Sequence, residues 1–206
     1  MGNINQNNLS EGRKERIRDK IILGAKNYKQ YLCDKTFRIL CEDGTEKEVR
    51  FFGADFQHLT GVKSDLNDER FFDNCRLGTI DKGNILTNQK YNWSTLKRKS
   101  DRIVNIHGLL YENNDKTLLL EEFEAKSCVF PVAIKNNEMD TCVGFTSDIN
   151  KARSLRNAIS ASKCKDEKKI VFIAAKKNGE EKFTELVYSA ENINPDEKLE
   201  VLNNSL

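Results

Sequence analysis

Apolar residues recur at steps of three and four from about residue 11 to residue 33, which is the spacing of one face of an α-helix. Ser10 and the charged residues that follow it are typical of a helix start. The chain is therefore expected to begin with an amphipathic helix. Its apolar face consists of Ile17, Ile21, Gly24, Ala25, Tyr28 and Leu32.

The spacing changes to alternation in residues 36–52, TFRILCEDGTEKEVRFF. Asp43-Gly44 in the middle of this segment is typical of a tight turn between two strands. The segment therefore predicts a β-hairpin. Its apolar positions are Phe37, Ile39 and Cys41 on the first arm and Val49 and Phe51 on the second.

Helical spacing returns in two later segments. A short helix is predicted from Ser64 or Asp65, either of which can cap it, to Gly78, which is suited to end it. A longer helix is predicted from Ser94 to about Tyr111. The apolar face of the longer helix consists of Leu96, Ile103, Ile106 and Leu110.

After residue 115 the helical pattern gives way to short segments rich in Val, Ile, Phe and Thr, separated by turn residues. Asn178-Gly179 is a strong hairpin signal. The basic segment 148–168 is too long for a tight turn, so it is interpreted as a loop that carries function. The five predicted strands cover residues 116–125, 127–136, 141–147, 168–177 and 181–189.

This order of elements predicts an α+β fold. An N-terminal helix and β-hairpin are followed by further helices and then by an antiparallel sheet of four to five strands. The 206 residues suit one domain, and the 38% that are hydrophobic suffice for a core. We expect a flexible N-terminus over residues 1–10, a single domain over 11–190 and a polar tail over 191–206.

Charge is unevenly distributed, although the formal net charge is only +2. Residues 151–169 carry seven Lys or Arg against two acidic residues, and residues 180–200 carry two Lys against seven acidic residues. Residues 11–30 are also basic. Such separation is compatible with a basic face that binds a polyanion. It is equally compatible with solvated patches that partly neutralise each other.

No segment indicates a membrane or an oxidising compartment. No apolar run approaches the roughly 20 residues that span a bilayer, and the N-terminus does not have the pattern of a signal peptide. The six cysteines are scattered without a CxxC pair, which argues against a zinc site and a disulfide framework. We therefore expect a cytoplasmic protein with free thiols and no membrane partner.

The two histidines are the first candidates for chemistry, because the chain has no phosphate-binding loop, HExxH or GxSxG motif. His107 lies on the apolar face of a predicted helix, where a structural role is more common. His58 follows a predicted strand and is close to Thr60, Gly61 and Lys63. Its imidazole can act as base or acid near neutral pH.

Two motifs carry a resemblance to a known family: F-x-HLTG around His58, and VGFTSDINKARSLRNA at residues 143–158. From about Phe37 to Tyr188 the chain resembles the phage-associated nuclease family named after Barnase, EndoU, the tRNA-cutting colicins and RelE. The resemblance implies helices packed on an antiparallel sheet that binds RNA. It also implies RNA cleavage without a metal or other cofactor, often by a toxin or mobile-element effector. It does not specify the catalytic residues.

Metal-free RNA cleavage needs a base for the 2′-hydroxyl, cations for the charge on phosphorus and an acid for the leaving oxygen. We assign these catalytic roles to His58, Lys63, Arg153 and Ser154. RNA-binding roles are expected for Thr60, Lys151, Arg156 and Lys163. The aromatic residues considered for base stacking are Tyr91, Trp93 and Tyr111.

Two other classes of function remain open. One is a non-catalytic phage or mobile-element protein that inhibits a host defence complex, which the absence of an acid partner for His58 and the acidic C-terminal stretch favour. The other is a small-molecule enzyme with an anion-binding loop. The expected partners are RNA and an antidote or host-defence protein.

Overall fold

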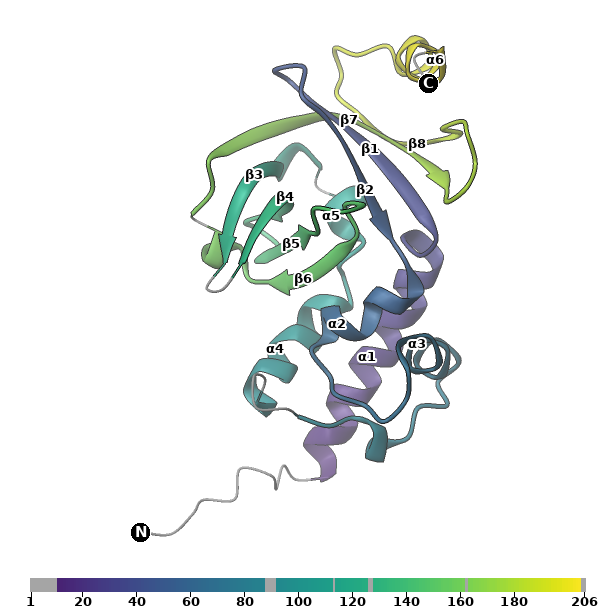
Figure 1. Cartoon of the computed structure of the whole chain (residues 1–206), viewed down its shortest axis with the longest axis vertical. Helices are drawn as coiled ribbons and strands as arrows, with labels where there is room; N and C mark the ends of the chain where they lie inside the picture. The colour runs from purple at the N-terminus through teal and green to yellow at the C-terminus, as the bar shows by residue number, and fades with distance from the viewer. Residues whose placement is uncertain (1–10, 88–91, 113, 126–127, 162, 205–206) are drawn as a thin grey trace.

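The computed structural model describes residues 11–87, 92–112, 114–125, 128–161 and 163–204, and it confirms the α+β class. Figure 1 shows a group of helices at one end of the molecule and a strongly curved sheet at the other. These helices are α1 (Glu11–Tyr31), α2 (Phe56–Thr60), α3 (Asp68–Leu77) and α4 (Trp93–Ile103).

The predicted apolar face of α1 is buried. Gly24 lies on this face against α4, where an added Cβ would come within 2.8 Å of the Ile103 side chain. This distance is too short for any side chain larger than hydrogen, so Gly24 allows the two helices to pack closely. The buried residues of α1 are Ile17, Ile21, Gly24, Ala25 and Tyr28.

Two predicted helices have different bounds in the structure. The N-cap of α3 is Asn67, whose side chain accepts a hydrogen bond from the Arg70 N–H at 2.9 Å, so the predicted start at Ser64 or Asp65 is wrong. Gly78 ends α3 with a φ of 76°, as expected. The predicted helix from Ser94 to Tyr111 breaks after Ile103 and resumes as α5 (Gly108–Tyr111).

The eight strands found in the described residues form one antiparallel sheet, in the order β2-β1-β7-β3-β4-β5-β6, with β8 also paired to β7. The hairpin is therefore part of the main sheet, which is larger than the four to five strands predicted. The strands are β1 (Lys35–Cys41), β2 (Glu46–Phe51), β3 (Thr117–Ala125), β4 (Cys128–Asn136), β5 (Thr141–Phe145), β6 (Ala152–Arg156), β7 (Asp166–Lys177) and β8 (Glu185–Ser189).

Strand β6 lies inside the segment 148–168, so the prediction of one long functional loop is wrong. Ala152 and Leu155 are both buried on the same face of β6, although residues three positions apart in a regular strand lie on opposite faces. They share a face because the pairing of β5 with β6 shifts register between Gly144 and Phe145. A β-bulge of this kind interrupts the two-residue alternation by which strands are recognised in a sequence.

The start of β6 also contacts β2, at the other edge of the sheet. Arg50 and Lys151 form a parallel bridge, in which the Arg50 N–H donates to the Asn150 carbonyl at 2.9 Å. The curved sheet therefore approaches closure at this point. As a result, the segment that follows β2 lies beside the residues at the start of β6.

An aromatic cluster occupies the core between the helices and the sheet. Tyr28 is fully buried, with its ring edge toward neighbouring rings, and its hydroxyl donates to the Phe52 carbonyl at 3.0 Å. This bond attaches α1 to the segment between β2 and α2. The other rings of the cluster are Phe37, Phe51, Phe56, Phe71, Phe72 and Phe145.

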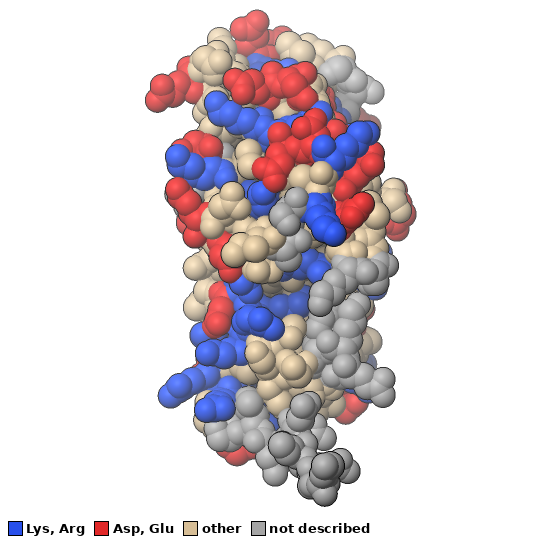
Figure 2. Space-filling model, turned by 90° about the vertical axis from the view of Figure 1, so that its left-hand side faces the viewer, with Lys and Arg blue, Asp and Glu red and all other residues tan. Residues whose placement is uncertain are grey.

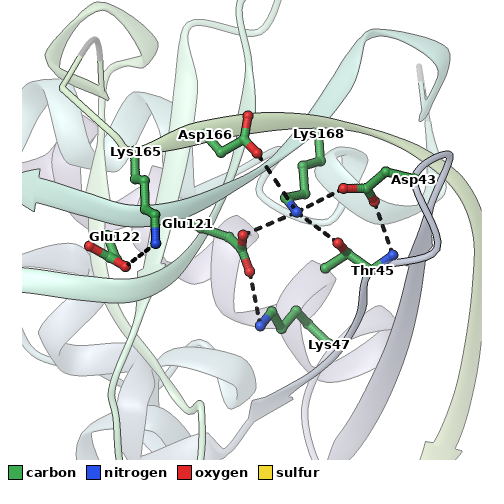
Figure 3. Close-up of polar contacts among 8 residues, drawn as sticks. All are labelled: Asp43, Thr45, Lys47, Glu121, Glu122, Lys165, Asp166 and Lys168. Carbon is green, nitrogen blue, oxygen red and sulfur yellow. Dashed lines mark hydrogen bonds and ion pairs between the residues drawn. The ribbon is translucent and has the colours of Figure 1, made fainter.

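The tip of the β1–β2 hairpin is held to the sheet by the polar network in Figure 3. The Lys168 Nζ lies 2.8 Å from Asp43 Oδ2, 2.7 Å from Thr45 Oγ1 and 3.1 Å from Glu121 Oε2. The hydrogen bond from Lys168 is the largest cause that lowers the pKa of Asp43, to about 2. Lys168 therefore connects the hairpin turn to β3 and β7.

The C-terminal segment expected to be a polar tail contains the helix α6 (Pro195–Asn204), in which Leu202 is buried. All six cysteines are free, and four of them are buried. Among the described residues, no helix is both long and apolar enough to cross a bilayer.

Candidate active site

His58 lies in α2, close behind the second strand of the hairpin. A 3₁₀ turn (Gly53–Asp55) leads from β2 into α2, and Gly61 ends the helix with a φ of 73°. Thr60 is buried, donates to the Gln57 carbonyl at 2.7 Å and accepts from the Val62 N–H at 3.2 Å. Thr60 therefore stabilises the turn from inside and does not line the surface.

Strand β6 packs against α2 (Figure 1). Two cations, Arg153 in β6 and Lys151 just before it, are close enough to act on the pKa of His58. Burial is the largest cause that lowers the pKa of His58, and Arg153 is the next. Lys151 and Lys99 lower this pKa further, whereas Asp68, whose Oδ2 lies 3.8 Å from the His58 Nε2, raises it. The net shift favours a neutral imidazole, while 41% of the side chain remains exposed to a substrate.

Asp55 is a fourth member of the site, and it was not among the residues expected from the sequence. It precedes His58 by three residues, about one helical turn, and is only 4% exposed. Its Oδ2 is buried without a hydrogen-bond partner among the described residues. Burial raises the pKa of Asp55 to about 6, although Lys151 and Arg153 act in the opposite direction.

Asp55 and Lys151 line a cleft of about 490 Å³ between α1, α3 and the start of β6. The cleft is also lined by two ion pairs, Lys29 with Asp34 and Arg76 with Asp73, and by the aromatic side chain of Phe72. A volume of this size is within the range of roughly 300–1,000 Å³ typical of ligand sites. The carboxyl group of Asp55 is thus beside a space that a substrate group can enter.

Three of the other predicted site residues lie elsewhere. Ser154 and Arg156 are on the sheet face of Cys142, opposite the face that α2 covers, and the Arg156 Nε donates to Ser154 Oγ at 2.9 Å. Lys163 lines a separate pocket near Glu122. The structure therefore brings together only Lys151 and Arg153 from the basic segment.

Lys63 is exposed, and its backbone pairs with that of Leu86. The cations with the largest effect on the pKa of His58 are Arg153, Lys151 and Lys99, so Lys63 is not the principal positive charge at the imidazole. The positive charge at the imidazole therefore comes from side chains at least about 40 positions away from His58 in the sequence, and not from its neighbour Lys63.

The second histidine lies in a different environment. His107 is buried and its ring stacks on Tyr31, with centroids 4.6 Å apart. Its Nε2 is 3.6 Å from a Glu112 carboxylate oxygen, and its Nδ1 has no hydrogen-bond partner among the described residues. These neighbours belong to α1 and to the end of α5, so His107 is a core residue and does not pair with His58.

Of the aromatic residues considered for base stacking, Tyr111 is engaged internally, since its hydroxyl donates to Glu185 at 2.8 Å. Trp93 is partly buried at the start of α4. Tyr91 lies outside the described residues. In the described part of the chain, no three His, Cys, Asp or Glu residues are grouped to hold a metal ion.

Comparison with models of protein families gives a match, which agrees with the resemblance carried by the two sequence motifs. Residues 20–192 match the model of the phage-Barnase-EndoU-ColicinE5/D-RelE like nuclease4 family. The chain belongs to this family. The match extends from α1 to beyond β8 and includes Asp55, His58, Lys151 and Arg153 of the candidate site. No curated protein and no solved structure matches the chain.

Proposed function

We propose that this member of the nuclease family is an endoribonuclease that cleaves RNA by attack of a 2′-hydroxyl on the adjacent phosphorus, without a metal ion. One observation carries the proposal: Asp55 and His58 are one helical turn apart and their pKa values are shifted in opposite directions, beside Arg153 and Lys151. A pair of titratable groups whose surroundings separate their preferred charge states is typical of acid–base catalysis.

In this mechanism the neutral imidazole of His58 accepts the proton of the 2′-hydroxyl. The 2′-oxygen then forms a bond to phosphorus, and the bond from phosphorus to the 5′-oxygen breaks. The protonated carboxyl group of Asp55 donates its proton to the departing 5′-oxygen. The products are a 2′,3′-cyclic phosphate and a 5′-hydroxyl end. His58 and Asp55 return to their starting forms by exchanging one proton through solvent.

The cations stabilise the charge that develops on the phosphoryl oxygens. Arg153 is exposed beside His58, and its guanidinium can donate two parallel hydrogen bonds to a phosphate. Lys151 is close enough to lower the pKa values of both Asp55 and His58, so its charge acts on the same space. Arg153 and Lys151 therefore take the roles that the sequence analysis divided between the catalytic and RNA-binding groups.

The presence of Asp55 bears directly on the alternative of a non-catalytic binding protein. That alternative was favoured because His58 lacked an acid partner in the sequence. Asp55 supplies one, so a catalytic function is the better supported interpretation. Family membership supports a further proposal, that the nuclease acts in the cytoplasm as a toxin or effector of a phage or mobile element.

The decisive experiment incubates the purified protein with a defined RNA in the presence of EDTA and identifies the product ends. We expect cleavage in EDTA, with 2′,3′-cyclic phosphate and 5′-hydroxyl ends. His58→Ala should reduce the rate about a hundredfold or more while the circular dichroism spectrum stays unchanged. Cleavage that requires Mg²⁺, or products with 5′-phosphate ends, would overturn the proposed mechanism.

A further inference from the structure

A second hollow on the helical end of the molecule lies between α1 and α4, and the proposed chemistry does not use it. It has a volume of about 750 Å³, larger than the cleft beside Asp55. Four of the residues around it are cationic, and the sole tryptophan of the chain, Trp93, forms part of its wall. The cationic residues are Arg13, Arg16, Lys20 and Lys97.

Most of these cations are available to a ligand. Lys20 is paired with Asp101, but Arg13, Arg16 and Lys97 are exposed and have no acidic partner among the described residues. Lys168, by contrast, is enclosed by carboxylates. Three unpaired cations around one hollow are suited to several phosphate groups.

Trp93 adds a feature that a simple anion site does not need. Its Nε1 is buried and has no hydrogen-bond partner among the described residues, although a buried indole N–H usually has one. The Lys14 Nζ lies 5.9 Å from the centre of the Trp93 ring. The nucleotide match rests on the ring and not on this buried N–H: an aromatic ring in the wall of a hollow surrounded by cations suits a ligand that offers a base to stack and phosphates to bind.

The hollow and the proposed active site lie on different sides of the same helix. One face of α4 lines the hollow and is turned toward α1. It consists of Trp93, Lys97 and Ser100, which are four and three positions apart. Lys99, between the last two, points toward α2, where its Nζ donates to the Leu59 carbonyl at 3.2 Å. One strand of RNA can therefore reach both places by crossing α4.

The surface charge supports such a path. Figure 2 shows Lys and Arg with few acidic residues in the lower part of the face drawn, where the helices lie, whereas Asp and Glu are intermixed with Lys and Arg in the upper part. On α4 itself, four basic residues stand against the single acid Asp101. A phosphate backbone that leaves the His58 site is attracted more strongly toward the helices than toward the far end of the sheet, where the charges of both signs partly cancel.

We infer that the hollow between α1 and α4 is a second RNA-binding subsite, which holds an unpaired nucleotide of the substrate outside the cleavage site. The base stacks on Trp93, while Arg13, Arg16 and Lys97 bind the flanking phosphates. The subsite requires a single-stranded segment, because a base in a duplex cannot reach the ring. This inference rests on the proposed function only in taking RNA as the ligand.

The test measures binding of a short fluorescent single-stranded RNA by anisotropy, in the His58→Ala background so that cleavage does not interfere. Combined substitution of Arg13, Arg16 and Lys97 by Gln should weaken binding about tenfold or more. It should also reduce the slope of log Kd against log salt by about two units, since each phosphate contact to a single strand contributes roughly 0.7. A charge-matched control replaces Lys26, Lys177 and Lys182 by Gln, and its affinity should change little.

Trp93 provides an independent test. Trp93→Leu should weaken binding roughly tenfold, as loss of one stacked base does, whereas Trp93→Phe should retain most of the affinity. Because Trp93 is the only tryptophan, quenching of its fluorescence by unlabelled RNA reports contact at this place directly. A duplex RNA of the same sequence should compete weakly.

The outcomes separate this inference from the proposed function. If the variants with Gln bind like their control and RNA leaves the fluorescence of Trp93 unchanged, the subsite is overturned, even where His58-dependent cleavage is observed. If RNA quenches Trp93 and the Gln variants lose affinity, the subsite stands, even where the wild-type protein cleaves nothing. Equal competition by duplex RNA or by a mononucleotide would overturn the assignment to single-stranded RNA.

Discussion

At the scale of single residues, Asp55 and His58 obtain their properties from what surrounds them. Asp55 is enclosed near Tyr28 and Phe52, and burial is the main cause of its raised pKa. His58 is less enclosed, and both burial and the charge of Arg153 favour its neutral form. Both shifts raise the fraction of molecules in which the carboxyl group holds a proton and the imidazole does not, which is the charge state that the proposed reaction requires.

The pH dependence of cleavage tests this assignment. The base must be deprotonated, so kcat/KM should rise with pH through the lowered pKa of His58. The acid must be protonated, so kcat/KM should fall as pH rises through the pKa of Asp55, at about 6. We expect a bell-shaped profile with an optimum on the acid side of neutrality, measured with a short RNA substrate.

Two carboxylate substitutions distinguish Asp55 from its neighbour. Asp55→Asn should slow cleavage about a hundredfold and remove the falling limb of the profile. Asp68→Asn should retain both limbs and move both to lower pH, because Asp68 raises the pKa of His58 and that of Asp55. A falling limb that persists in Asp55→Asn would show that another group is the acid.

At the scale of elements, β6 decides which residues of the basic segment reach the site. The register shift between Gly144 and Phe145 lets both Ala152 and Leu155 point into the core. Arg153, between them, lies beside α2, whereas Arg156 lies on the opposite face of the sheet. Two arginines three positions apart thus have different surroundings.

This difference provides a matched pair of substitutions. Arg153→Gln should lower kcat/KM about a hundredfold, since it removes a donor to the phosphoryl oxygens, and should raise the pKa of His58 in an NMR titration. Arg156→Gln removes the same charge but should change cleavage less than about threefold and leave the His58 titration unaltered. Equal losses in the two variants would mean that both arginines act through general charge alone.

At the scale of the whole molecule, the sheet runs from the end that carries the candidate site to the end that carries the tip of the β1–β2 hairpin. The bridge between Arg50 and Lys151 lies at the end that carries the site, and the Lys168 network holds the hairpin tip at the other end. Both contacts involve the hairpin, which joins the N-terminal third of the chain to strands from its last third. The hairpin is therefore a structural link as well as the element that precedes His58.

The Lys168 network should contribute to stability in a pH-dependent way. The folded pKa of Asp43, about 2, is below its ordinary value of 3.8, so its contribution is present above about pH 4 and is lost as pH falls toward 2. Asp43→Asn should lower the Tm by a few degrees at pH 7, and the difference from wild type should vanish near pH 2. Asp65→Asn, an exposed carboxylate outside the network, is the control and should not show this pattern.

The sequence by itself determined those helices and strands in which buried residues recur at a regular spacing. The face of α1 and the two arms of the hairpin were predicted because each buries one side of a regular helix or strand. The F-x-HLTG motif likewise indicated His58 and the family, since the residues of the α2 turn are adjacent in the chain. These features depend on neighbours within a few positions.

Only the tertiary structure decided the remaining features, because they depend on residues far apart in the chain. A bulge hides β6 from any test of alternation, and the closing of the sheet selects Lys151 and Arg153 as the cations beside His58. The raised pKa of Asp55 comes from burial that the sequence does not display, although its place among Phe52, Gly53 and Phe56 was a usable signal. Charge, burial and hydrogen bonding at the site are properties of three-dimensional neighbours, and the fold brings those neighbours together.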